Sequence, residues 1–262
     1  MKVGIIGCGN LGSSLINGFL DAGALRAKEL VASDMNDEKL QKLRKFGIET
    51  TTDNKNLVEH CDVIFIAVKP DIVESVLEET KESSKGKLFV SVAAGVSTKF
   101  IEAKTHARVI RVMPNICGVV GEMASCFSLG TRASRDDEEL VEKLLGSMGM
   151  TFIVDEKLMN AVTGLSGSGP AYFYFIVKAL QEAGVELGLS GEISLKLAAQ
   201  TAKGAGEVIL REGKTLEELT GMVCTPKGTT IEGLEVLKGR KVADAIRDAV
   251  KAAARRAKEL SR

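Results

Sequence analysis

A polar hexapeptide near the C-terminus carries residue types suited to binding an anion. Thr225–Thr230 reads TPKGTT and interrupts a region rich in Ala, Leu, Lys and Glu. A helical pattern resumes at Ile231, so Thr229 or Thr230 is expected to act as its N-cap. Free amides at a helix start, beside hydroxyls and a glycine that allows close approach, can bind a carboxylate or a phosphate. The alternative interpretation is a polar turn that joins two helices and binds nothing.

A glycine-rich segment at the other end of the chain points to a dinucleotide. Gly7–Gly12 reads GCGNLG and fits the pattern G-x-G-x-x-G. It follows the apolar run Val3–Ile6 directly and opens a helical pattern from Leu11 to Ala22, which is the context that supports the pattern. The first glycine makes the tight turn, the second admits a pyrophosphate, and the third lets helix and strand pack closely. A glycine-rich turn without a ligand is the alternative.

The second apolar run ends where an adenine ribose is expected. Asp34 lies roughly 20 residues after Gly12, near the position of the acid that accepts hydrogen bonds from the 2′-hydroxyl of NAD. A carboxylate there would repel the 2′-phosphate of NADP, and no arginine is adjacent to offset it. Ser33 and Asn36 can still donate to a phosphate. The choice between NADH and NADPH therefore stays open on chemical grounds.

Short apolar runs separated by amphipathic stretches must position these residues. Such alternation predicts βαβ units, a mainly parallel sheet and right-handed crossovers. Two further runs, 124–129 and 151–154, are expected to add strands, and helices are expected over 37–46 and 136–148. The principal strand candidates are Val3–Ile6, Leu30–Ser33, Asp62–Val68, Leu88–Val92 and Val109–Val112.

The pattern changes after Asp155, because no convincing strand follows it. Helical periodicity runs through 171–183, 193–211, 215–222 and 242–260. The predicted fold is therefore an α/β Rossmann-type domain over residues 1–155, followed by an all-α domain over residues 156–262. The apolar stretches 171–180 and 195–205 are too extensive for a lone bundle, which predicts an obligate dimer.

Composition excludes several classes of protein. The 262 residues carry 35 Lys and Arg against 35 Asp and Glu, and this balance argues against a nucleic-acid partner. No apolar run is long enough to span a bilayer, and the run after Lys2 is too short for a signal peptide. The five cysteines include no Cys-x-x-Cys pair, and only two histidines are present, so neither zinc nor a disulfide framework is expected. We expect a cytoplasmic protein.

Six segments, in order along nearly the whole chain, resemble the motifs of the pyrroline-5-carboxylate reductase family. The first is shared by many dehydrogenases, while the last two are specific. The resemblance implies the final step of proline biosynthesis, in which a hydride passes from NAD(P)H to the C=N carbon of Δ1-pyrroline-5-carboxylate. It also implies a helical dimerisation domain and a homodimer or oligomer of dimers. The segments are Gly7–Gly12, Ala67–Pro70, Ala93–Val96, Val112–Asn115, Leu165–Tyr172 and Thr225–Thr230.

The same resemblance implies roles for individual residues. The expected cofactor is NADPH, with NADH also allowed because of Asp34. Thr230 is the expected catalytic residue, its hydroxyl facing the ring nitrogen, and Gly228 and Thr229 join it around the substrate carboxylate in a site completed by the partner subunit. The implied cofactor-binding residues are Gly7, Gly9, Asn10, Leu11, Gly12, Ser33, Asp34, Asn54, Val68, Lys69, Ala94 and Gly95.

The chain departs from the family pattern in two loops. Lys227 stands where the family usually has glycine; it can lend charge to the carboxylate, point to solvent, or leave Pro226 to set the turn. Ile116-Cys117 stand where Thr-Pro is usual, which leaves the shape of that loop open.

Two other functions fit parts of the sequence. A β-hydroxyacid-dehydrogenase-like oxidoreductase would use a Lys one turn into the helix after Leu165–Pro170, and Ala171–Tyr174 offers none. A non-catalytic nucleotide-binding regulator should carry a DNA-binding or partner-binding element. No basic recognition helix is found, and the Arg255–Lys258 run reads as a solvated helix face.

Overall fold

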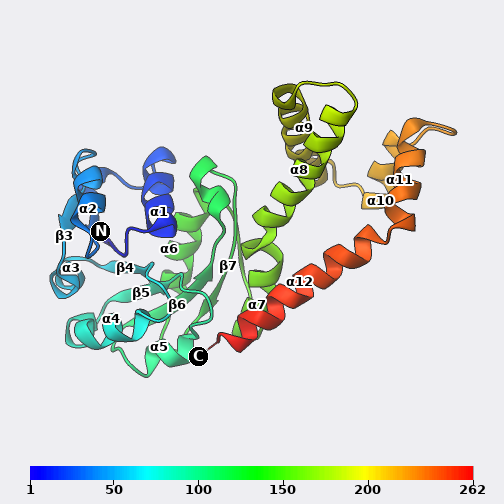
Figure 1. The fold of residues 1–262 in the computed structure, drawn as a ribbon. Helices are drawn as coiled ribbons and strands as arrows, with labels where there is room; N and C mark the ends of the chain where they lie inside the picture. Colours follow the sequence, from blue (N-terminus) through cyan, green and yellow to red (C-terminus); the bar gives the residue numbers. More distant parts are fainter. Residues whose placement is uncertain (262) are drawn as a thin grey trace. The chain divides into compact units, whose positions relative to one another are not determined.

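The computed structural model describes residues 1–261, and the chain divides into two units. The first comprises Met1–Ser168 together with the described residues from Lys251 onward, and the second comprises Gly169–Val250. Figure 1 draws both units, coloured along the sequence. Each is described by itself below.

A twisted sheet with the strand order β3-β2-β1-β4-β5-β6-β7-β8 forms the centre of the first unit. Neighbouring strands are parallel except β6 and β7, which pair antiparallel. The order reverses at β1, which pairs with β2 on one side and β4 on the other. Open sheets of this kind bind ligands at the carboxyl ends of the strands beside such a reversal. The strands are β1 (Val3–Ile6), β2 (Leu30–Ser33), β3 (Glu49–Thr51), β4 (Val63–Ile66), β5 (Leu88–Ser91), β6 (Arg108–Met113), β7 (Met123–Leu129) and β8 (Gly149–Ile153).

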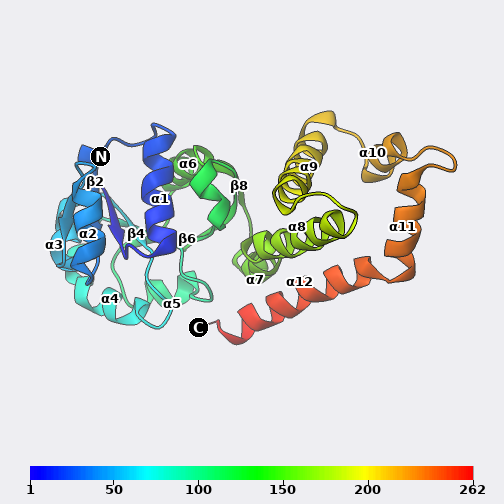
Figure 2. The same cartoon turned by 45° about the horizontal axis from the view of Figure 1, so that its top comes forward.

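Helices cover both faces of the sheet, which is why the central strands are apolar throughout. All residues of β1, β2, β4 and β5 are buried. One core lies under α1 (Asn10–Asp21), α2 (Asp37–Arg44) and α6 (Arg135–Gly146). In this core the ring centroids of Phe19 and Phe65 are 5.4 Å apart. The other core lies under α3 (Asn54–His60), α4 (Val73–Thr80) and α5 (Thr98–Glu102). The layers can be followed in Figure 2.

This arrangement confirms the predicted α/β fold and its strands, with one strand missed. β3 reads Glu-Thr-Thr, is three residues long and is partly exposed. An edge strand of this kind has no apolar alternation, so periodicity could not reveal it.

The second unit is entirely helical, as the sequence predicts. It contains α8 (Gly169–Glu186), α9 (Gly191–Glu212), α10 (Leu216–Val223), α11 (Thr229–Gly239) and the start of α12 (Val242–Glu259). Its only buried residues are Gly169, Ser194 and Ala198. Short elements elsewhere are η1 (Ala27–Glu29), η2 (Glu82–Ser84), η3 (Ile116–Val120), η4 (Glu156–Leu158), α7 (Met159–Val162) and the π-helical turn η5 (Thr163–Gly167).

One buried carboxylate ties β6 to α6. Asp137 accepts hydrogen bonds from Arg108 Nε at 2.7 Å and Nη2 at 3.0 Å, and from the amide and hydroxyl of Ser134, with which it forms a capping box. Burial opposes ionisation of this carboxyl. The bonds from Arg108 and Ser134 outweigh it and hold the pKa of Asp137 below its ordinary value.

We predict that Asp137→Asn lowers the free energy of unfolding by about 1.5–3 kcal/mol at neutral pH, because charged hydrogen bonds of this kind are lost. A lowered folded-state pKa stabilises the fold above the unfolded value near 4 and less as the pH falls through the folded value. The difference between wild type and variant should therefore shrink in acid. Glu139→Gln, which breaks an exposed pair with Arg135, is the control and should cost below about 1 kcal/mol. Equal losses in denaturant unfolding would contradict this.

Candidate nucleotide and substrate sites

The carboxyl ends of neighbouring parallel strands bring the predicted nucleotide residues to one edge of the sheet. Ile6 is level with Ser33 and with Ile66, and Ile66 is level with Ser91. The segments that follow these residues therefore share an edge. They carry the glycine loop Gly7–Gly12, Asp34, Val68-Lys69 and Ala94-Gly95, which are far apart in the sequence.

The glycine loop is closely packed at two of its three glycines. Gly7 has φ +97°, and a Cβ there would lie 2.8 Å from the carbonyl oxygen of Ala67. Its amide donates to the Ser33 oxygen at 2.8 Å, which joins the loop to β2. A Cβ on Gly12 would collide with the Gly7 carbonyl. Both positions need glycine for packing alone, before any ligand is considered.

The middle glycine faces open space. Gly9 is the N-cap residue of α1, and no side chain caps that helix. A Cβ built on Gly9 would meet nothing within 4 Å. The first-turn amides of Asn10 and Leu11 thus begin a helix beside an unfilled space, which fits a pyrophosphate.

Asp34 is held by the glycine loop and by α2. Its Oδ2 accepts from the Cys8 amide at 2.7 Å and from Lys39 Nζ at 3.1 Å, and its Oδ1 accepts from the Asn36 amide at 2.8 Å. Partial burial opposes ionisation, yet the Asn36 and Cys8 amides and the Lys39 ammonium together keep the pKa of Asp34 below its ordinary value. The carboxylate is therefore charged at neutral pH and shared between three donors.

Ser33 and Asn36 are engaged within the protein. Ser33 is buried, and its hydroxyl donates to Asn54 Oδ1 at 2.7 Å. The Asn54 amide group donates in turn to Glu79 at 2.8 Å. Asn36 caps α2 by accepting from the Glu38 and Lys39 amides. The proton of Ser33 is thus already bonded, in contrast to the phosphate donor that the sequence allows.

Lys39 is the residue at this edge that sequence reasoning missed. It lies five positions after Asp34 and forms an ion pair with it at 3.1 Å. No arginine is adjacent to Asp34, so the sequence did not indicate an offsetting cation. A lysine in the first turn of the helix that follows this acidic position was the signal in the sequence that could have revealed the ion pair.

The loop after β5 borders the end of the last helix within the same unit. Gly95 has φ +75°, and a Cβ there would lie 2.9 Å from the Leu260 carbonyl oxygen. Three residues further on, the Thr98 amide donates to Glu156 Oε1 at 3.3 Å. The same oxygen accepts from the buried Arg111 at 2.8 Å. The segment that contains Ala94 and Gly95 is therefore bonded to Glu156 through Thr98 and lies beside Leu260.

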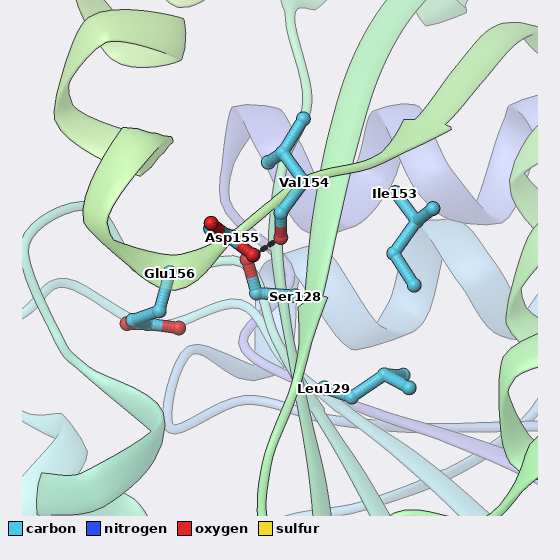
Figure 3. A pocket seen from close by; sticks show the side chains of 6 residues that line it. All are labelled: Ser128, Leu129, Ile153, Val154, Asp155 and Glu156. Carbon is cyan, nitrogen blue, oxygen red and sulfur yellow. Dashed lines mark hydrogen bonds between the residues drawn. The ribbon is translucent and has the colours of Figure 1, made fainter.

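Glu156 also lines a hollow beside β7 and β8, shown in Figure 3. The hollow measures about 390 Å³. In it the Ser128 hydroxyl donates to the Val154 carbonyl at 2.7 Å. It lies on the far side of β6 from β5, so it does not coincide with the edge of the sheet that carries the predicted nucleotide residues.

The Met-Pro-Asn segment is held by its asparagine despite the departure that follows it. Asn115 Oδ1 accepts from the amides of Cys117 at 3.2 Å and Ala124 at 3.3 Å, and its amide group donates to the Ser166 carbonyl at 3.2 Å. Ile116 and Cys117 begin the short 3-10 helix η3. This asparagine thus joins the end of β6 to the π-helical turn before α8.

The TPKGTT loop lies in the second unit and makes a tight turn. The Gly228 amide donates to the Thr225 carbonyl at 2.8 Å, and Lys227 has φ +62°. Lys227 therefore occupies the left-handed region that favours glycine, the residue usual at this position in the family that the motifs resemble.

The predicted N-cap of α11 was wrong. Gly228 is the N-cap residue, the helix begins at Thr229, and no side chain caps it. The extended backbone needed at an N-cap falls on Gly228 because the turn closes there. Neither threonine hydroxyl is used as a cap, so both remain free for the predicted contact with a carboxylate.

Among residues 1–261 no three or more His, Cys, Asp or Glu side chains gather as ligands for a metal ion. None of the described helices is long and apolar enough to cross a membrane.

Two family models match the chain. Residues 156–260 match a model described as pyrroline-5-carboxylate reductase dimerisation, which supports an oligomeric protein. Residues 2–95 match a model described as NADP oxidoreductase, coenzyme F420-dependent.

Known proteins and solved structures are similar over the whole chain. Pyrroline-5-carboxylate reductase 2 of Pongo abelii is 40% identical, covering 99% of this chain and 84% of that protein. Pyrroline-5-carboxylate reductase of Arabidopsis thaliana is 40% identical, covering 99% and 95%. The pyrroline carboxylate reductase of Plasmodium falciparum with NADP bound is 30% identical with a TM-score of 0.91, covering 100% and 98%. The Coxiella burnetii pyrroline-5-carboxylate reductase is 32% identical with a TM-score of 0.93, covering 100% and 98%.

The open space over Gly9 predicts that a side chain at this position weakens nucleotide binding without destabilising the fold. Gly9→Ala should change the free energy of unfolding by less than about 1 kcal/mol, because its φ of −72° suits alanine. It should weaken NAD(P)H binding at least about tenfold by intruding on the pyrophosphate. Gly12→Ala should lower both the free energy of unfolding and the affinity for NAD(P)H, and Gly146→Ala in α6 should change neither quantity. Fluorescence titration and thermal unfolding measure the two quantities; unchanged binding in Gly9→Ala would place the pyrophosphate elsewhere.

Proposed function

Because this chain belongs to the pyrroline-5-carboxylate reductase family, we propose that the carboxyl edge of β1, β2, β4 and β5 binds its nucleotide and that the TPKGTT loop binds its substrate. The protein reduces Δ1-pyrroline-5-carboxylate to L-proline with a hydride from NAD(P)H, the last step of proline biosynthesis. The observation that carries the assignment of the nucleotide site is the uncapped start of α1 beside the open space at Gly9.

The nucleotide residues divide by the part of the cofactor that they would hold. Gly9, Asn10 and Leu11 take the pyrophosphate at the start of α1, and Gly7 and Gly12 allow the close packing that positions them. Asp34 takes the adenine ribose, with Ser33 and Asn54 forming the hydrogen-bonded layer beside it. Val68 and Lys69 border the nucleotide after β4, and Ala94 and Gly95 approach the nicotinamide after β5.

The substrate carboxylate is assigned to the start of α11. The support is that Gly228, not a threonine, is the N-cap residue, so the Thr229 and Thr230 hydroxyls are not used for capping. Amides at a helix start favour an anion. Lys227, held in the left-handed region by the turn, adds a cation to this loop.

The chemistry asks little of the protein in proton transfer. A cyclic imine can be protonated at nitrogen near neutral pH, which makes its carbon electrophilic, and the nicotinamide supplies the hydride when bound. The protein must hold the two partners close and aligned. The Thr230 hydroxyl hydrogen-bonds the ring nitrogen, whose basicity rises as the imine becomes an amine.

The protein is an oligomer, and we propose a homodimer, or an oligomer of dimers, with its substrate site completed by the partner subunit. The support is the second unit, where large apolar side chains such as Phe173, Phe175 and Leu187 are exposed. Exposed apolar area on this scale marks an interface.

We propose residues 1–155 and 156–262 as the functional domains. We also propose that small molecules are the only other partners.

We also propose a cytoplasmic location. All five cysteines are free thiols, and Cys8 and Cys61 are buried. Burial raises the pKa of the Cys8 thiol to about 12 and that of Cys61 to about 11. Unpaired, unreactive thiols are typical of a reducing compartment.

The role of Thr230 predicts a loss in kcat. Thr230→Ala should lower kcat about five- to a hundredfold, because a hydrogen bond that strengthens in the transition state is lost. NAD(P)H affinity, measured by fluorescence, should not change. Thr229→Ala is the matched control and should act mainly on the KM for pyrroline-5-carboxylate. Wild type should oxidise NAD(P)H only after this substrate is added. An unchanged kcat in Thr230→Ala would remove the hydroxyl from the mechanism.

If the exposed apolar side chains form the subunit interface, a charged residue introduced among them should dissociate the subunits. Phe175 is 76% exposed in the isolated chain. Phe175→Glu should shift the protein toward monomer in sedimentation experiments and lower its activity, since obligate interfaces bury roughly 2,000–5,000 Å². Phe46→Glu, at an exposed phenylalanine of the first unit, should leave the assembly intact. A fully active wild-type monomer at micromolar concentration would contradict the shared site.

A further inference from the structure

Asp34 and Lys39 form a charged pair at the place assigned to the adenine ribose. Lys39 Nζ lies 3.1 Å from Asp34 Oδ2, the oxygen that also accepts from the Cys8 amide. The Asp34 side chain is 12% exposed and that of Lys39 is 42% exposed. The carboxylate is thus packed against the glycine loop, while the ammonium stands on its solvent side.

Lys39 occupies a position where a cation is locally unfavourable. It lies in the first turn of α2, whose positive dipole end disfavours a positive side chain. The preceding Asp37 and Glu38 follow the usual rule for a first turn. Pairing with Asp34 compensates for the dipole in this structure.

The ammonium retains capacity for a second acceptor. A lysine carries three N–H donors, and the bond to Asp34 uses one of them. Its flexible stem can move the charge by a few ångströms without moving the backbone. An anion beside Asp34 would therefore lie within reach of the Lys39 ammonium.

Arg44, the arginine of α2, does not replace Lys39. Arg44 pairs with Asp37 at 3.0 Å and donates to the Thr50 hydroxyl at 2.6 Å. Glu38 is exposed and adds a negative charge to the same turn. A phosphate at this edge would face Asp34 and Glu38 as repelling groups, with Lys39 as the cation beside them.

We propose that Lys39 binds the 2′-phosphate of NADPH, so that Asp34 and Lys39 together let one ribose site accept both NADH and NADPH. With NADH, Asp34 accepts from the 2′-hydroxyl and Lys39 stays on Asp34. With NADPH, Lys39 turns to the phosphate and offsets the repulsion by Asp34. The inference rests on the proposed nucleotide edge, and Lys39 acts on cofactor choice alone.

Binding of two nucleotide fragments to the intact protein tests this without turnover. Adenosine 2′,5′-bisphosphate carries the 2′-phosphate and adenosine 5′-monophosphate lacks it. Lys39→Gln should weaken binding of the bisphosphate about five- to thirtyfold in calorimetry, the effect of losing one charged contact. Binding of the monophosphate should change less than about twofold. Lys42→Gln, an exposed lysine of the same helix, is the control and should change neither.

A double-substitution cycle separates a direct contact from an effect through Asp34. Asp34→Asn should strengthen bisphosphate binding, because it removes the repelling charge. If Lys39 touches the phosphate, Lys39→Gln should still weaken bisphosphate binding at least about fivefold in the Asp34→Asn background. If Lys39 only neutralises Asp34, its effect should vanish there, and the proposal is overturned.

The remaining outcomes are distinguishable. Equal losses for both fragments in Lys39→Gln would overturn the proposal by showing a general effect on the site. Binding of both fragments without discrimination by Lys39 would overturn it while leaving the nucleotide edge in place. If neither fragment bound the wild type while NADPH did, the adenosine would lie elsewhere, and the proposed nucleotide edge would fail as well.

Discussion

Close backbone approach at the carboxyl ends of β1, β2 and β4 is the constraint on which the proposed nucleotide edge depends. Gly7 bonds to the end of β2 and leaves no room for a Cβ against Ala67, and Gly12 leaves none against Gly7. This packing brings the start of α1 close to the ends of the strands. The open space at Gly9 and the anchorage of Asp34 on the Cys8 amide are consequences of the same approach.

The two units differ in how they bury their apolar side chains. The first buries its apolar strands between two helical layers, which hold the carboxyl ends of the strands in place. The second buries almost none of its own apolar side chains, and membership of a family with a helical dimerisation region explains why it can remain so. A reaction that needs alignment more than acid–base groups suits the proposed assignment of the cofactor to the first unit and the substrate to the second.

Periodicity and motif spacing were sufficient for most of the fold. The central strands are apolar throughout because both faces are covered, and the glycine pattern sits between a strand and a helix as its context requires. β3 escaped prediction because a polar edge strand of three residues carries no alternation. The N-cap of α11 was misplaced by one or two residues, because Ser, Thr, Asp and Asn preferences describe caps on average and the turn at Lys227 shifted this one to Gly228.

By itself the sequence determined the class of fold, the order of its strands along the chain, the glycine loop, the acidic position after β2 and the family. These follow from local backbone preference and burial, which a contiguous stretch encodes. Only the tertiary structure decided that Asp34 bonds to both Cys8 and Lys39 and that Ser33 bonds to Asn54. It also decided that Glu156 bonds to the segment after β5 and that Leu260 lies beside it. Such contacts depend on how separate elements pack, and no local pattern in the chain records which side chains that packing brings within hydrogen-bonding distance.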